Sequence, residues 1–79
     1  MRTFNYKDIM KTAEHIRDFN AGIMADLAVK KDWDMLNRIR FSAMSEIEGL
    51  ERLTVTIGYN SKSPIVIILH NIWKQLLNG

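Results

Sequence analysis

The sequence predicts an all-α fold in which a long antiparallel αα-hairpin packs against a shorter third helix. Apolar residues recur at helical spacing in three segments, and capping and turn residues separate those segments. The expected helices cover residues 5–30, 32–57 and 64–78 of a single small domain that spans residues 1–79. The alternative is an α+β fold with a β-hairpin at residues 53–69.

The first helix is predicted from an apolar stripe that begins after Asn5. Asn5 is a suitable N-cap, and Phe4 and Ile9 on either side of it can form a hydrophobic staple. Because the stripe continues past Gly22, we expect one helix and not two. Asn20 lies inside the stripe, where a polar side chain usually finds a partner or fixes the register. The stripe contains Ile9, Ala13, Ile16, Ile23, Met24 and Leu27.

The second helix is predicted to begin at the N-cap Asp32 and to end at Gly58, a natural C′ glycine. Tyr59, which follows, is expected to pack back on Leu53. One apolar stripe runs unbroken between these ends and consists of Met35, Leu36, Ile39, Ala43, Ile47, Leu50, Leu53 and Ile57.

The segment from Leu53 onward is ambiguous, because its apolar residues also alternate with a period of two. An isolated β-hairpin is marginally stable, however, and it would leave only a short last helix. In the helical alternative Ser63 is the N-cap, Pro64 occupies the first turn and Gly79 takes the C′ position. Burying large apolar side chains at roughly 1.5–3 kcal/mol each outweighs the weak helix propensity of β-branched residues. The apolar arc contains Ile65, Val66, Ile68, Leu69, Ile72, Trp73, Leu76 and Leu77.

Composition narrows the function classes. The chain has 79 residues, a net charge of +2 and no cysteine, which excludes disulfides and thiolate zinc sites. Its longest unbroken apolar run is Ile65 to Leu69, too short for a signal peptide or a membrane span. We therefore expect a cytoplasmic protein with no membrane partner.

No motif predicts chemistry. His15 and His70 lie on different helices without metal-binding spacing, and the glycines are scattered instead of forming a phosphate loop. No neighbouring residue activates a serine. The expectation is a non-enzymatic protein with no catalytic residue, no cofactor and no metal.

Apolar residues that the three predicted helices do not need indicate an interaction surface. On the second helix they face roughly opposite the main stripe, and a short chain cannot bury two apolar faces within three helices. We therefore expect self-association as a homodimer or small oligomer, or docking on another protein, with Arg38 and Arg40 at the rim. The candidate interface residues are Trp33, Phe41, Met44, Val55, Ile67 and Phe19.

A basic and aromatic cluster at residues 30–41 offers the alternative of nucleic-acid or nucleotide binding. Its cations are Lys30, Lys31, Arg38 and Arg40, which surround Trp33 and Phe41. Two acidic residues interrupt the cluster, and Arg38 and Arg40 point about 160° apart on a helix.

The leading hypothesis is therefore a small interaction module that acts by docking helical faces on a macromolecular partner. Proteins of this size class often serve as inhibitors, adaptors or regulators, including those that phages and mobile elements encode.

Overall fold

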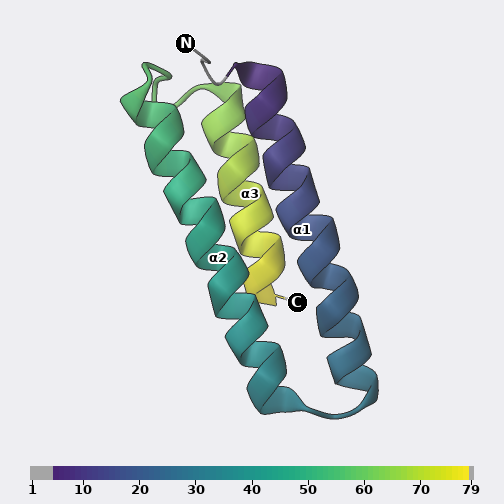
Figure 1. Cartoon of the computed structure of the whole chain (residues 1–79). Helices are drawn as coiled ribbons and strands as arrows, with labels where there is room; N and C mark the ends of the chain where they lie inside the picture. Colours follow the sequence, from purple (N-terminus) through teal and green to yellow (C-terminus); the bar gives the residue numbers. More distant parts are fainter. Residues whose placement is uncertain (1–4, 79) are drawn as a thin grey trace.

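Three helices make up the fold of the described residues (Figure 1). The structure is a computed structural model and describes residues 5–78, in which α1 spans Tyr6–Val29, α2 spans Trp33–Thr56 and α3 spans Pro64–Asn78. The all-α prediction is thereby confirmed, and each helix end lies within one residue of its expected position. No strand occurs in residues 5–78, so the alternative β-hairpin is wrong. The expected roles of Phe4 and Gly79 lie outside the described residues.

The third helix covers only part of the hairpin. Figure 1 shows α3 between α1 and α2 at the open end of the hairpin and ending before the corner that joins them. Its 15 residues, against 24 in each of α1 and α2, correspond to about 22 Å against about 36 Å of helix. The part of the hairpin nearest the corner therefore lacks a third helix. None of the three helices combines the length and apolar composition that crossing a bilayer requires.

The core forms where the three apolar stripes meet. The residues with at most 3% of their surface exposed come from all three helices and are Ile9, Ala13, Ala43, Ile47, Thr54, Ile65, Leu69, Ile72 and Leu76. Thr54 is the buried polar member, and its hydroxyl donates a hydrogen bond to the carbonyl oxygen of Leu50 at 2.7 Å. Asn20 likewise bonds within its own helix, because its Nδ2 donates to the carbonyl oxygen of Ile16 at 2.7 Å. It therefore needs no partner from another helix.

Met44 was predicted to lie on the exposed interface, and this prediction is wrong. Only 6% of its surface is exposed, and it belongs to the core. Met44 lies one turn from Glu48, which binds Trp73 of α3, so it falls within the stretch of α2 that α3 covers. Trp33 lies on the same line of α2 but closer to the corner, beyond the end of α3.

The corner between α1 and α2 is short, because Asp32 lies only two residues after Lys30, the C-cap of α1, and is itself the N-cap of α2. The amide N–H of Lys31 donates to the carbonyl oxygen of Ala28, and that of Asp32 donates to the carbonyl oxygen of Leu27. This is the Schellman arrangement, and it places Lys31 in the left-handed conformation at φ +59°. The Asp32 carboxylate then accepts a hydrogen bond from the N–H of Met35 at 3.2 Å.

The end of α2 has the same arrangement with the expected residue. Gly58 has a positive φ, its N–H donates to the carbonyl oxygen of Val55, and the N–H of Tyr59 donates to that of Thr54. Tyr59 and Leu53 both pack against the core, and the predicted contact between the two side chains stays a prediction. At the start of α3, by contrast, the hydroxyl of Ser63 is buried without a hydrogen-bond partner among the described residues, so the expected side-chain cap does not form.

Replacing Lys31 with glycine should stabilise the protein. A non-glycine residue in the left-handed region costs roughly 1–2 kcal/mol, only partly offset by the greater entropy that glycine has in the unfolded chain. We expect Lys31→Gly to raise the melting temperature by about 4–8 °C, measured by circular dichroism. Lys30 is the matched control, because its φ of −78° is helical and Lys30→Gly should lower the melting temperature. Equal effects of the two substitutions would contradict this explanation.

Candidate functional site

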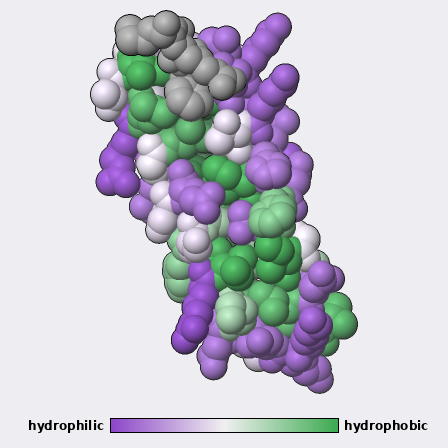
Figure 2. All heavy atoms as spheres, in the orientation of Figure 1, coloured by the Kyte–Doolittle hydropathy of each residue, from purple (hydrophilic) through white to green (hydrophobic). Residues whose placement is uncertain are grey.

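Most of the predicted interface residues are exposed, but they do not form one surface. The exposed fractions are 60% for Phe19, 56% for Trp33, 58% for Phe41, 46% for Val55 and 51% for Ile67. Figure 2 shows hydrophobic side chains along the middle of one face, from its upper left to its lower half, with hydrophilic side chains on both sides. The surface is hollowed in two regions, one near the corner and one along the line where α2 meets α3.

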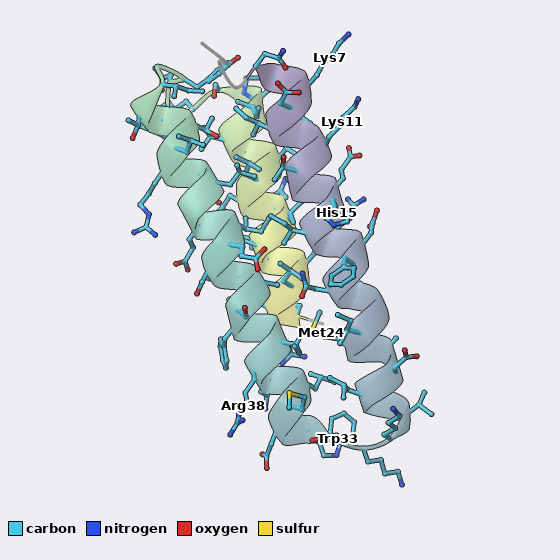
Figure 3. All side chains as sticks on the ribbon, in the orientation of Figure 1. Lys7, Lys11, His15, Met24, Trp33 and Arg38 are labelled. Atoms are coloured by element: carbon cyan, nitrogen blue, oxygen red, sulfur yellow. The ribbon has the colours of Figure 1, made fainter. Side chains whose placement is uncertain are left out.

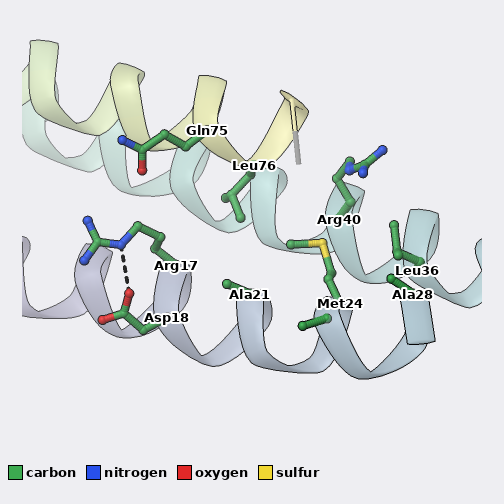
Figure 4. Close-up of a pocket in the computed structure, with 10 residues that line it drawn as sticks. Arg17, Asp18, Ala21, Met24, Ala28, Leu36, Arg40, Gln75 and Leu76 are labelled. Atoms are coloured by element: carbon green, nitrogen blue, oxygen red, sulfur yellow. Dashed lines mark hydrogen bonds and ion pairs between the residues drawn. The ribbon is translucent and has the colours of Figure 1, made fainter. Parts of the chain in front are cut away.

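An apolar hollow continues the line of α3 toward the corner. We call it the corner groove; its volume is about 340 Å³, and it lies between α1 and α2 just beyond the last turn of α3 (Figure 4). Figure 3 shows Met24 pointing into the space between the two hairpin helices. Small and flexible apolar side chains form its floor, and four polar side chains form its rim. The floor consists of Ala21, Met24, Ala25, Ala28, Leu36 and Leu76, and the rim of Arg17, Asp18, Arg40 and Gln75.

The two arginines on this rim differ in their partners. The Nε of Arg17 donates a hydrogen bond to the Oδ1 of Asp18 at 2.9 Å, and this bond lowers the pKa of the Asp18 carboxyl below its usual value. The Nη1 of Arg40 donates to the neutral Oδ1 of Asn37 at 3.2 Å. The Nε of Arg40 is buried and has no acceptor within residues 5–78. Arg17 is thus neutralised by its neighbour, whereas Arg40 is not.

A second polar cluster joins α2 to α3. The indole Nε1 of Trp73 donates to the Oε1 of Glu48 at 2.9 Å, and the ring of His70 stacks on that of Trp73 with centroids 5.7 Å apart. The Nδ1 of His70 lies 3.7 Å from the Oε1 of Glu51, beyond hydrogen-bonding distance. We call this group the α2–α3 seam.

Glu51 is the member of the seam whose carboxylate is least well satisfied. Its Oε1 is buried and accepts no hydrogen bond from the described residues. Burial raises the pKa of the Glu51 carboxyl above its usual value, and Glu48 adds to that rise, while His70 acts against it. Sequence reasoning missed this residue, because a glutamate at a polar position of a helix has no local signal that another helix will cover it.

Two shallow hollows flank the seam, and Ile67 lines one of them while Val55 lines the other. One has a volume of about 400 Å³ and is lined in part by Ile67, His70 and Lys74. The other has a volume of about 440 Å³ and is lined in part by Val55 and Arg52. The hollows share Glu51, Ser61 and Val66 as lining residues.

The first of these hollows contains the side-chain types of a hydrolytic triad without its geometry. Ser61, His70 and Glu51 all line it, yet no hydrogen bond joins Ser61 to His70 in the described part of the chain. A nucleophilic serine needs such a bond to its base. Within residues 5–78, no three histidine or acidic side chains lie close enough together to hold a metal ion.

The remaining sequence candidates are dispersed. Phe19 stacks on the ring of His15 on the outside of α1, with centroids 5.7 Å apart. Lys30 and Lys31 form the corner, Arg40 lines the corner groove, and Arg38 points away from the hairpin in Figure 3. The two arginines of the basic cluster at 30–41 therefore lie in different settings, one on the groove and one pointing away from it.

No family model matches the chain, and no curated protein or solved structure matches it. The function must therefore be inferred from the surfaces themselves.

Replacing Glu51 with glutamine should stabilise the protein at neutral pH. A raised pKa means that the folded protein binds this proton more tightly than the unfolded chain does, so the contribution of Glu51 to stability is lost as pH rises through the folded-state pKa. We expect Glu51→Gln to raise the melting temperature by a few degrees at pH 7.5, corresponding to about 1 kcal/mol, and by much less at pH 4.

The matched control for this prediction is Glu46→Gln, which removes the same charge from an exposed position of the same helix. Thermal unfolding of both variants followed by circular dichroism across that pH range gives the comparison. A gain that is the same at pH 4 and pH 7.5, or that Glu46→Gln reproduces, would contradict the role of burial.

Proposed function

We propose that this chain is a non-enzymatic protein-interaction module that binds an amphipathic helix in the corner groove. The observation that carries the proposal is the early end of α3, which leaves an open groove in which Ala21 and Ala25 are exposed beside the largely buried Met24 and Leu36. A helix laid in that groove would continue the line of α3 and complete the three-helix packing along the full length of the hairpin.

The floor of the groove suits a helix. Ala21, Ala25 and Ala28 are small, so a second backbone can approach α1 closely, toward the lower end of the usual helix spacing of 8–10 Å. Met24 adds a side chain that adapts its shape to what it contacts. Helices that dock in apolar grooves present anchors spaced three and four residues apart, which matches this geometry.

Such a module would act by occupying a helix of its partner or by holding two proteins together. Inhibition, scaffolding and regulation all follow from that mode of action, and none of them requires a catalytic group.

Self-association is the second part of this proposal. Trp33 and Phe41 remain more than half exposed on α2, and aromatic side chains supply large contact areas at low entropic cost. Since they lie apart from the groove floor, a pair of chains can form through them while the groove stays open.

The groove is tested with a synthetic amphipathic peptide of about 15 residues that carries leucine on one face and glutamine on the other. We expect the labelled peptide to bind the wild-type chain in the micromolar range, measured by fluorescence anisotropy. Ala25→Arg should weaken binding about tenfold or more, because the new side chain fills the groove from an exposed helical position that tolerates it.

The control for the peptide experiment is Ser45→Arg, which adds the same charge at an exposed position of α2 that does not line the groove. It should leave the affinity unchanged. Equal binding by the wild-type chain and the Ala25→Arg variant would refute the groove as the binding surface.

Self-association is tested by sedimentation velocity from low to high micromolar concentration. We expect Trp33→Ala and Phe41→Ala to weaken assembly while the melting temperature of the dilute chain changes little, because both side chains are largely exposed. A wild-type chain that remains monomeric at the highest concentration would rule out this part of the proposal.

A further inference from the structure

We propose that the corner groove selects an acidic amphipathic helix of a different protein, whose carboxylate pairs with Arg40. This inference rests on the proposed function and names the chemistry of its partner. It follows from which charges on the rim of the groove are already satisfied.

Figure 4 shows Arg17 and Asp18 at one end of the groove and Arg40 at the other. The first two form an ion pair at 2.9 Å, so that end has no net charge to offer. The Asp18 carboxylate would also repel a carboxylate of the incoming helix placed beside it. Any charge that the groove recognises must therefore lie at the Arg40 end.

Arg40 lacks an ionic partner within residues 5–78. In the described part of the chain its guanidinium donates one hydrogen bond, to the side-chain Oδ1 of Asn37, and its Nε is buried without an acceptor. Guanidinium groups carry several donors in a planar fork that matches a carboxylate. Arg40 is only partly exposed, so its side chain is already held at the rim.

A helix that covers the groove removes more water from this guanidinium. Burying an unpaired charge is strongly unfavourable, whereas a carboxylate brought by the incoming helix forms a charge-assisted hydrogen bond with it. An incoming lysine adds repulsion instead. The groove should therefore discriminate between helices with the same apolar face by the charge that lies opposite Arg40.

The chain's own apolar helix does not meet this requirement. α3 is the most apolar of the three helices, and its residues Pro64–Asn78 include no aspartate or glutamate. A second copy that offered α3 to the groove would leave Arg40 without a carboxylate. α1 and α2 do carry carboxylates, but their apolar stripes are already buried in the core. The occupant that satisfies both the apolar floor and Arg40 is therefore an acidic helix of another protein.

The test uses three peptides with the same leucine face and with glutamate, glutamine or lysine at the flanking positions. We expect the wild-type chain to bind the glutamate peptide about tenfold more tightly than the lysine peptide, with the glutamine peptide in between. Arg40→Gln should reduce this preference to about twofold or less. Arg40→Lys should retain part of it, because the charge remains but the fork is lost.

Arg38→Gln is the matched control, because it removes the same charge from an exposed position two residues away that points away from the hairpin. It should keep the preference for glutamate. If Arg38→Gln and Arg40→Gln reduce the preference alike, the discrimination comes from net charge and the inference is overturned.

The remaining outcomes separate the two proposals. Equal binding of all three peptides to the wild-type chain would overturn the role of Arg40 but leave the groove as a helix-binding surface. Binding of none of them would overturn the proposed function together with this inference. Melting temperatures of all variants establish that a lost preference does not reflect an unfolded chain.

Discussion

The packing of α3 between α1 and α2 is the interaction on which the rest of this structure depends. A helical hairpin alone has no third element to cover its apolar side, and α3 brings five buried side chains to it. At about 1.5–3 kcal/mol for each large apolar side chain, this is a major part of what a 79-residue chain can gain from a core. The five residues are Ile65, Val66, Leu69, Ile72 and Leu76.

The same packing explains both candidate surfaces. Because α3 is shorter than the hairpin, it closes the core at the open end and leaves the corner groove at the other. Where α3 meets α2, its Trp73 donates a hydrogen bond to the exposed Glu48, and its His70 lies beside the partly buried Glu51. Glu48 accepts the indole hydrogen bond there, whereas the Oε1 of Glu51 is buried with no donor from the described residues. Buried polar atoms without a hydrogen-bond partner, and non-glycine residues with a positive φ, are rare in folded proteins. Where they occur, they often mark functional sites.

Much of the fold could be predicted from the sequence, because caps and helical stripes depend on residues close to one another along the chain. Asn5, Asp32 and Gly58 mark helix ends through hydrogen bonds that span three to five residues. The candidate site could be predicted only in part. Five of the six predicted interface residues are exposed as expected, and they are Trp33, Phe41, Val55, Ile67 and Phe19. Met44 is buried instead. No local sequence pattern predicts how far α3 extends along α2, so the burial of Met44 could not be predicted.

The sequence by itself thus determined the three helices, their lengths and the absence of cysteine chemistry, all of which follow from residue identity and short-range spacing. Only the tertiary structure decided where α3 ends relative to the corner, because that depends on how the two apolar faces interlock. It also decided that, among residues 5–78, Arg17 has a neutralising partner while Arg40 has none, and that Glu51 is partly buried where α2 meets α3. The burial of a side chain depends on helices that are distant in the sequence. For this reason only the tertiary structure shows which polar residues, such as Arg40, are partly buried and able to recognise a partner.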